Sequence, residues 1–522
     1  MSPIELSILV SRVEAVCGEM GAVLQRAAFS PNIKDRLDFS CALFDTSGGL
    51  YAQAAHIPVH LGSMAYAMAG IVSGLDWREG DVLILNDPFL GGTHLPDVTM
   101  VAPLFFEGVL VSFVANRAHH ANIGSDTPGS MPVSRSIEEE GIIIPPTFIY
   151  RAGQQVTALE PALEALIAGS SSGDFSAQLS AVRIGLQRLE ALVLSFIGDR
   201  TAEQNTANVA EKFASAIREV NDYGQRMAQN LVKRIPNGIY EFSDVMDDDG
   251  FGNTDVLVKA MLTIDDSTIH VDFSGTSSQV EGNINCPISV AAAAVFYVFR
   301  CLLPEEVPSC AGTFSAIQIS APQGSLVNAK RPAATAAGNV ETSMRLVDVV
   351  LGALSIALPD EIPAASQGTM NNVAMGNHNA ERPWDYYETL AGGMGASKRG
   401  PGISAVQAHM TNTLNTPIES LESHYPLRVL TYAIRRNSGG EGKYRGGDGL
   451  VRELEFMEPA EVTLLTERRS HRPWGLEGGG EGREGINSLD GNLLGSKVQF
   501  SVRPGQRLKL ATPGGGAMGS SQ

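Results

Sequence analysis

Two short stretches of the sequence carry side chains of the kinds that bind metal ions. "GGTHLPDVTM" places His94 and Asp97 three residues apart, and "RAHHANIG" brings His119 and His120 further along the chain. Two imidazoles and one carboxylate suit Zn, Mn, Fe or Ni and leave coordination positions open for water or substrate. The same residues also fit a polar hairpin end whose histidines are only hydrogen-bonded. The spacing favours the metal site over that alternative.

A β-hairpin would bring these two stretches together. Two apolar, strand-like runs flank Glu107-Gly108, which we interpret as a two-residue turn. Counting back from that turn places Asp97 opposite Ala118, and His119 opposite Pro96. Local folding alone then gathers both stretches within ligand distance of each other.

Alternation along the strands leaves the choice of the third ligand open. Side chains point to opposite faces in turn, which puts His119 on the side of His94 and His120 on the side of Asp97. Pro96 and the neighbouring glycines make this end of the hairpin irregular. The pattern therefore does not decide between His119 and His120.

Three residues earlier in the chain are further candidates. Asp38, in "KDRLDFS", could supply a second carboxylate, although a surface-turn aspartate is the simpler interpretation of this residue alone. His56 and His60, in "HIPVHLGSM", would share one face of a helix, but Pro58 argues against a helix there. We interpret these two histidines as pocket-wall residues at most.

The elements that must position these residues are both helices and strands. Apolar spacing predicts helices at about 4–28, 61–73, 175–197, 203–234, 287–303 and 340–358, the last capped by Asn339. Strand patterns occupy about 38–53, 80–87, 98–118, 239–275 and much of 427–522. This mixture predicts a mixed α/β (α+β) fold. We expect three parts: a metal-site domain at 1–170, a helical segment with a β-rich domain at 171–330, and a helix followed by a Gly-rich β region at 331–522.

The composition narrows the partners and the compartment. The formal net charge is −19 with no sustained basic run, which disfavours nucleic acid and anionic membranes as partners. The N-terminal stretch "MSPIELSILV" has no basic region, so we expect no signal peptide. The most apolar run, 288–299, is too short to span a bilayer, and the five cysteines form no CxxC pair. We therefore expect a cytoplasmic protein with reduced thiols.

Several longer segments resemble one known family. They include "NIKDRLDFSCALFD", "NDPFLGGTHLPDVTMVAP", "ANRAHHANIG", "GNVETSMRLVDVVLGAL" and "HMTNTLNTPIESLESHYPLRV". The chain resembles the hydantoinase B/oxoprolinase family over nearly its whole length. That family comprises subunits of N-methylhydantoinases, 5-oxoprolinase-like and caprolactamase-like enzymes, and acetone or acetophenone carboxylases. Because the segments are long, distinctive and in the same order, the match is specific.

The resemblance implies a ligand set that the spacing left open. Matching stretches assign metal ligation to His94, Asp97 and His119, with Asp38 of "RLDFS" as a further ligand. The ion would be divalent: Zn, Mn or Fe. His120 becomes the catalytic candidate, either as an acid/base group or as a residue that supports the ligands. The stretches "GNINC" and "HMTNT" are expected beside the pocket, with no role assigned to them.

The resemblance also implies an activity and a partner. Members of the family usually work with a hydantoinase A-type subunit that carries the ATP site, and the present sequence contains no Walker A pattern. We therefore expect the metal-containing catalytic subunit of an ATP-dependent cyclic-amide hydrolase. Its substrate would be a hydantoin, 5-oxoproline or a related lactam, and its assembly a hetero-oligomer in which the partner binds ATP.

Three other functions stay open at this point. An ATP-dependent ketone carboxylase would belong to the same family. Two histidines and one carboxylate also make the facial triad of non-haem Fe(II) oxygenases. A non-enzymatic scaffold that binds the A-type partner is the third. Bicarbonate dependence would identify the carboxylase, and ferrous-dependent oxygen uptake would identify the oxygenase. A lack of stoichiometric metal would identify the scaffold.

Overall fold

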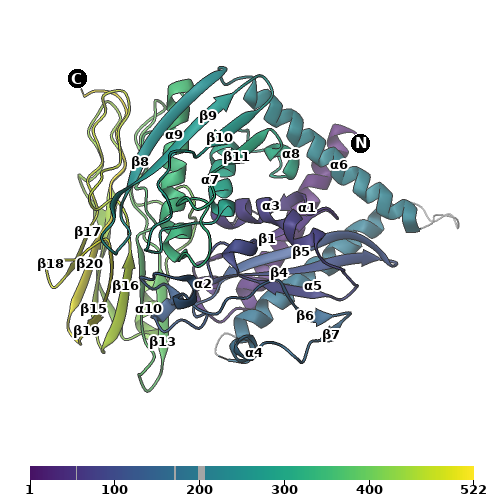
Figure 1. Ribbon diagram of the computed structural model, residues 1–522, viewed down its shortest axis with the longest axis horizontal. Coiled ribbons are helices and arrows are strands. Elements are labelled where there is room, and N and C mark those ends of the chain that lie inside the picture. Colours follow the sequence, from purple (N-terminus) through teal and green to yellow (C-terminus); the bar gives the residue numbers. More distant parts are fainter. Residues whose placement is uncertain (55, 170–171, 198–205, 522) are drawn as a thin grey trace.

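Both helices and β-sheets build the molecule. A computed structural model of the chain describes residues 1–54, 56–169, 172–197 and 206–521. Within these ranges the strands form four sheets, which confirms the predicted mixed α/β fold. In Figure 1 the N-terminal sheet and its helices lie to the right, and the C-terminal strands lie to the left.

The sheet that carries the metal-binding stretches has seven strands in the order β2-β1-β5-β4-β3-β6-β7. Every neighbouring pair in it is antiparallel. Its members are β1 (Phe39–Phe44), β2 (Leu50–Gln53), β3 (Val82–Leu85), β4 (Asp97–Phe106), β5 (Val109–His119), β6 (Thr147–Arg151) and β7 (Gln154–Gln155).

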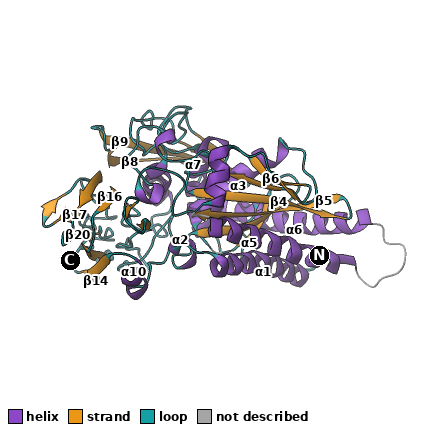
Figure 2. Cartoon of the chain, turned by 90° about the horizontal axis from the view of Figure 1, so that it is seen from below, coloured by secondary structure: helices purple, strands orange, loops and turns teal. Residues whose placement is uncertain are grey.

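Helices cover both faces of this sheet, as the edge-on view of Figure 2 shows. One face packs against α1 (Pro3–Ala27), α5 (Ser172–Leu194) and α6 (Thr206–Val232), and the other against α3 (Pro58–Ser73). α3 packs in turn on α7 (Ile288–Cys301), where a Cβ at Gly62 would lie only 2.5 Å from the Cα atom of Ala293. Two short helices, α2 (Pro31–Lys34) and α4 (Pro161–Ala168), lie in the connections.

The β4–β5 hairpin differs from the prediction by one residue. The two-residue turn forms, but a β-bulge leaves Val111 of β5 unpaired, so that Asp97 pairs with His119 and not with Ala118. A bulge sets two residues of one strand against one of the other and thereby reverses the expected alternation. Asp97 and His119 therefore point to the same face, and the predicted pairing of Asp97 with the side of His120 is wrong.

The middle of the chain forms a second sheet with the order β11-β10-β9-β8. Its strands are β8 (Gly238–Asp248), β9 (Thr254–Ile264), β10 (Ile269–Asp272) and β11 (Ile317–Ser320), and α8 (Ala311–Phe314) precedes β11. This sheet packs on α9 (Ser343–Ala357), which itself contacts α7. A turn of π-helix, Gly338–Thr342, leads into α9, so Asn339 lies inside a helical turn and is not the predicted N-cap.

The C-terminal region forms two further sheets. One has the order β13-β12-β16-β19 and the other β14-β15-β20-β17-β18, and a shared core that includes Leu450, Leu454, Val462 and Leu464 lies between them. The first contains β12 (Asn372–Asn377), β13 (Trp384–Glu388), β16 (Ala460–Leu465) and β19 (Lys497–Val502). The second contains β14 (Leu427–Arg435), β15 (Gly449–Phe456), β17 (Ile486–Leu489), β18 (Asn492–Leu493) and β20 (Arg507–Ala511), and α10 (Ile418–His424) precedes it.

The predicted parts of the chain pack against one another. α5 and α6, which belong to the second part by sequence, cover the sheet of the first. The boundaries at residues 170 and 330 stay a prediction, and residues 170–171 lie outside the described ranges. Among the described helices none is both long enough and apolar enough to cross a membrane.

Candidate metal centre

Three of the predicted residues converge at one buried point of the central sheet. One potential ligand atom from each of His94, Asp97 and His119 lies within 4.8 Å of those of the other two. The Oδ1 atom of Asp97 is 3.1 Å from Nε2 of His94 and 3.2 Å from Nδ1 of His119. All three side chains are buried, so this cluster is shielded from bulk water.

The hairpin and the loop before it position these side chains. Asp97 begins β4 and His119 ends β5, and the two are direct partners in the ladder. The preceding glycines let the chain turn back toward the sheet: Gly91 has a φ of 112°, and a Cβ at Gly92 would lie 2.2 Å from the carbonyl oxygen of Asn86. That turn brings His94 onto the same face as its two partners.

Donors surround the carboxylate of Asp97. Its Oδ2 atom accepts hydrogen bonds from Thr93 Oγ1 at 2.7 Å and from Asn339 Nδ2 at 3.3 Å, and it lies 3.2 Å from Nε2 of His60. Burial raises the pKa of Asp97, but the neighbouring histidines outweigh that effect and hold the pKa well below its ordinary value. Asp97 is therefore the ionised anchor of the cluster.

His60 lines the cavity, as predicted for a pocket-wall residue, and it also lies beside the carboxylate of Asp97. Pro58 is the first residue of α3, where a proline is tolerated because that N–H has no helical partner, so the helix begins before the predicted start near residue 61 and includes His60 but not His56. The helix directs His60 at the site, with Nε2 3.8 Å from Oδ1 of Asp38. His56 precedes the helix, and its Nδ1 accepts the backbone N–H of Cys41. Proline at the first helical position was the signal that could have placed His60 within the helix.

Asp38 lies just before β1, beside His119. Its backbone carbonyl accepts the N–H of His119 at 3.0 Å, and its carboxylate lines the same cavity as the three clustered residues. It does not belong to the compact group itself. The cavity therefore has a second carboxylate on its wall, a short distance from the cluster.

His120 points to the opposite face of the sheet. Its Nε2 lies 2.8 Å from Oε1 of Gln178 on α5, and its ring packs on Phe175. The amide of Gln178 donates to Val98 and Asn116, so its oxygen must be the acceptor and His120 the donor. Burial lowers the pKa of His120, which keeps the ring neutral. His120 is not among the residues that line the cavity.

The cavity itself is small and has walls from distant segments. Its volume is about 20 Å³, which is room for an ion or a water molecule but not for a substrate ring. Tyr387 stacks on His119 with ring centroids 4.7 Å apart and planes at 10°. The "HMTNT" stretch contributes Met410, Thr411 and Thr413, which confirms its expected place beside the pocket.

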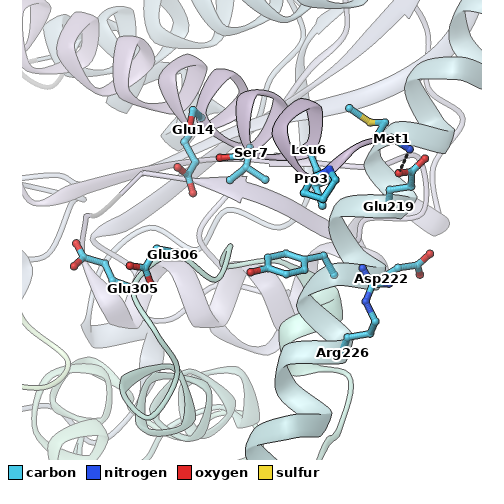
Figure 3. A pocket seen from close by; sticks show the side chains of 13 residues that line it. Met1, Pro3, Leu6, Ser7, Glu14, Glu219, Asp222, Arg226, Glu305 and Glu306 are labelled. Carbon is cyan, nitrogen blue, oxygen red and sulfur yellow. Dashed lines mark hydrogen bonds and ion pairs between the residues drawn. The ribbon is translucent and has the colours of Figure 1, made fainter.

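Larger pockets lie outside the cavity, and two of them are compared with it. One, of about 580 Å³, borders it through alternating residues: His56, Pro58 and Asn412 face this pocket, while their chain neighbours face the cavity. The other, of about 590 Å³, lies between α1 and α6 and is shown in Figure 3. Its lining is rich in carboxylates and includes no histidine or cysteine: Glu14, Glu219, Asp222, Glu305 and Glu306. Among the described residues, the one compact group of histidine and carboxylate side chains that could hold an ion lies in the small cavity.

The side chains of the cluster fit a divalent metal ion. Nε2 of His94 and Nε2 of His119 are buried and make no hydrogen bond within the described residues. Nδ1 of His94 faces the carbonyl oxygen of Ala336 at 3.3 Å, which fixes that ring and leaves Nε2 as the lone-pair donor. Two imidazole nitrogens and an ionised carboxylate, with Asp38 beside them, are ligands that Zn, Mn and Fe accept.

Comparison with known proteins gives one consistent result. The family model for hydantoinase B/oxoprolinase matches residues 2–521. The chain is 39% identical to 5-oxoprolinase 1 of Arabidopsis thaliana, over 99% of its own length and 42% of that protein. It is 30% identical to the putative B-type subunit of a D-/L-hydantoinase from Pseudomonas sp. (strain NS671), over 100% of its length and 90% of that relative.

Two solved structures have a similar fold. An ATP-dependent caprolactamase from Pseudomonas jessenii superposes with a TM-score of 0.89 and 26% identity, covering 100% of the present chain and 91% of the other. Acetone carboxylase in its nucleotide-free form gives a TM-score of 0.84 at 18% identity, covering 99% and 76%. At that lower identity the second likeness concerns the fold alone.

Proposed function

Because the chain belongs to the hydantoinase B/oxoprolinase family, we propose that it is the metal-containing catalytic subunit of an ATP-dependent cyclic-amide hydrolase. The observation that carries the proposal is the buried cluster of His94, Asp97 and His119, in which both imidazole rings lie against one ionised carboxylate and each keeps an Nε2 atom without a hydrogen bond among the described residues. The names of its relatives, which are 5-oxoprolinase, D-/L-hydantoinase and caprolactamase, point to cyclic amides as the substrate class.

The proposed chemistry answers the low reactivity of an amide. Resonance makes the carbonyl a poor electrophile, and phosphorylation of its oxygen by a partner subunit would make it a good one. His94, Asp97 and His119 would hold a divalent ion, with Asp38 as a further ligand from the cavity wall. Such an ion, when bound, supplies a Lewis acid that polarises the activated group and lowers the pKa of water. His60 would keep both carboxylates oriented from α3.

For His120 we propose the supporting role and not proton transfer. Its Nε2–H is engaged by Gln178, and its ring is packed against Phe175 on the far face of the sheet from the cavity. A group that transfers a proton to substrate must come within hydrogen-bond reach of it. The bond to Gln178 instead holds the end of β5 and so the backbone of the adjacent His119.

ATP binding would fall to a hydantoinase A-type partner in a hetero-oligomer. Two observations support this division of functions between the present chain and a partner. The sequence has no Walker A pattern, and the chain spans only 42% of the length of the plant 5-oxoprolinase that it matches, while it spans 90% of the bacterial relative that is named as a B-type subunit. The remainder of the longer protein has room for the ATP-binding function. We also propose a cytoplasmic location for the complex.

An activity screen tests the proposal. The purified chain is combined with an A-type partner and offered hydantoin, 5-oxoproline or caprolactam, with and without ATP. The expected result is turnover of at least one cyclic amide only with ATP, and its loss in a His94→Ala/Asp97→Ala double variant. Equal turnover without ATP, or full activity of the double variant, would overturn it.

The same screen separates the alternatives. Acetone with bicarbonate, with formation of a carboxylated product, would identify a ketone carboxylase, whose fold the chain shares. Oxygen uptake that depends on ferrous ion would identify a non-haem oxygenase. A chain that purifies and reconstitutes without stoichiometric metal would be a scaffold for its partner.

A further inference from the structure

A turn of π-helix, Gly338–Thr342, stands at the edge of the candidate metal centre. π-turns are rare and often occur at functional sites. This one is fixed to the "GNINC" segment: a Cβ at Gly338 would lie 1.8 Å from the carbonyl oxygen of Asn285, and Thr342 Oγ1 donates to the carbonyl of Ile284 at 2.5 Å. The close approach of the two backbones requires glycine at 338, and the result is a rigid turn beside the cavity.

Asn339 extends from this turn to Asp97. Its Nδ2 lies 3.3 Å from Oδ2 of Asp97, and the orientation of the amide follows from the chemistry, because an ionised carboxylate only accepts hydrogen bonds. Thr93 donates to the same oxygen. Both donors occupy Oδ2, so Oδ1 is the oxygen left facing His94 and His119.

Glu341 extends from the same turn in a second direction. Its Oε1 accepts hydrogen bonds from the backbone N–H of Met370 at 3.0 Å and from Nδ2 of Asn372 at 2.6 Å. The other end of the Asn372 amide, Oδ1, accepts the hydroxyl of Tyr387 at 2.6 Å. The ring of Tyr387 in turn stacks on His119. A continuous set of buried contacts thus joins Glu341 to the imidazole plane of His119.

We propose that the π-turn 338–342 is the positioning element of the metal centre. Asn339 orients the Asp97 carboxylate so that one oxygen serves the ion, and Glu341 fixes the plane of the His119 ring through Asn372 and Tyr387. The proposal rests on the metal centre proposed above and adds the residues that pre-orient it. Partners of this kind, which contact ligands and not the ion, commonly change metal affinity about 10- to 100-fold when removed.

The test measures metal affinity directly. The full chain is stripped with a chelator and titrated with Zn²⁺ or Mn²⁺ alone, and its unfolding midpoint is recorded without metal. Tyr387→Phe keeps the stacked ring and removes only the hydroxyl, so a weaker ion affinity by about 3- to 10-fold is expected at an intact fold. Asn339→Leu should weaken the affinity by about 10- to 100-fold.

Conservative and control variants complete the design. Glu341→Gln keeps an acceptor oxygen for Met370 and Asn372 and should retain wild-type ion affinity. Glu341→Ala should bind the ion as weakly as Tyr387→Phe, or more weakly. Tyr386→Phe is the matched control, because Tyr386 packs into the core between the C-terminal sheets, away from the cavity. It should leave the affinity unchanged.

The outcomes distinguish this inference from the proposed function. Wild-type chain that binds no ion overturns the metal centre itself. If the wild type binds the ion and both Tyr387→Phe and Asn339→Leu keep an affinity within twofold of it, the positioning role alone is overturned. A loss of affinity in Tyr386→Phe equal to that in Tyr387→Phe also overturns it. If Asn339→Leu does not fold, Tyr387→Phe and the two Glu341 variants still decide.

Discussion

Asp97 is the side chain on which the other polar groups of the site converge. Two histidines approach its Oδ1, while Thr93, Asn339 and His60 approach its Oδ2. A buried carboxylate is stable only with such partners, because burial of an unpaired charge is costly. The convergence of so many polar groups on one buried carboxylate is consistent with a site organised for a cation.

His60 gives the first prediction at the scale of residues. His60→Ala removes the group between the two carboxylates, so metal affinity should fall about 10- to 100-fold. His56→Ala is the matched control, since His56 is a neighbouring histidine that faces the outer pocket. Titration of both chelator-stripped variants with Zn²⁺ measures the difference, and equal affinities for the two would contradict the assignment.

His120 gives the second prediction. His120→Leu leaves Oε1 of Gln178 buried without its donor, and the free energy of unfolding should fall by about 1–3 kcal/mol. If His120 supports β5 and transfers no proton, the remaining activity should keep the shape of the wild-type pH–rate profile. Loss of one limb of that profile would identify His120 as an acid/base group after all.

The sequence predicted part of this residue set, and the reasons are physical. His94 and Asp97 lie near each other in the chain, and a hairpin turn brings His119 to them, so local signals suffice. Asn339 and Tyr387 reach the site by tertiary packing, which leaves no mark in local spacing. His60 is predicted only as a pocket-wall residue, because spacing along the chain does not show that its imidazole lies between two carboxylates.

At the scale of elements, the bulge in the β4–β5 hairpin decides which histidine faces the cavity. Val111 is an ordinary apolar strand residue, so nothing in its type marks it as the extra residue. Register counted from the turn was therefore off by one, and the alternation beyond the bulge was reversed. The family resemblance, and not the geometry of an ideal hairpin, gave the correct face for His119.

Deletion of Val111 tests this account of the hairpin. Without the extra residue the ladder should run regularly from the turn, with Leu104 still opposite Ser112 and Asp97 still opposite His119. Asp97 and His119 would keep their common face, so Zn²⁺ binding should be retained. Val111→Ala keeps the chain length and should bind as wild type. A folded deletion variant that loses Zn²⁺ binding would contradict this account of the register.

At the scale of the whole molecule, the site is composite. Its cavity draws walls from the N-terminal sheet, from the π-turn and from the C-terminal region that carries Tyr387 and Met410. The predicted metal-site domain at 1–170 contains the proposed ligands but not the residues of the C-terminal region that line the same cavity. The helix and strand content was predictable from periodicity, whereas the packing of distant segments around one cavity depends on the complete fold.

Between these regions lies a buried carboxyl that makes stability depend on pH. Burial raises the pKa of Glu341 to about 8. A carboxyl whose pKa is raised in the folded state stabilises the fold below its ordinary pKa, and this contribution is lost as the pH rises toward 8. Metal-free wild type should therefore lose stability relative to Glu341→Gln between about pH 5 and pH 8, by up to about 1.4 kcal/mol per pH unit. Denaturant unfolding of both proteins at several pH values measures this, and a constant difference would contradict it.

The central claim, that His94, Asp97 and His119 form a metal centre, is tested most directly by equilibrium metal binding. Chelator-stripped wild-type chain, and the His94→Ala/Asp97→Ala variant with its fold verified, are titrated with Zn²⁺ and Mn²⁺. The account predicts one high-affinity divalent ion per wild-type chain and none in the variant. Wild type without a stoichiometric site, or a variant that retains it, would contradict the account.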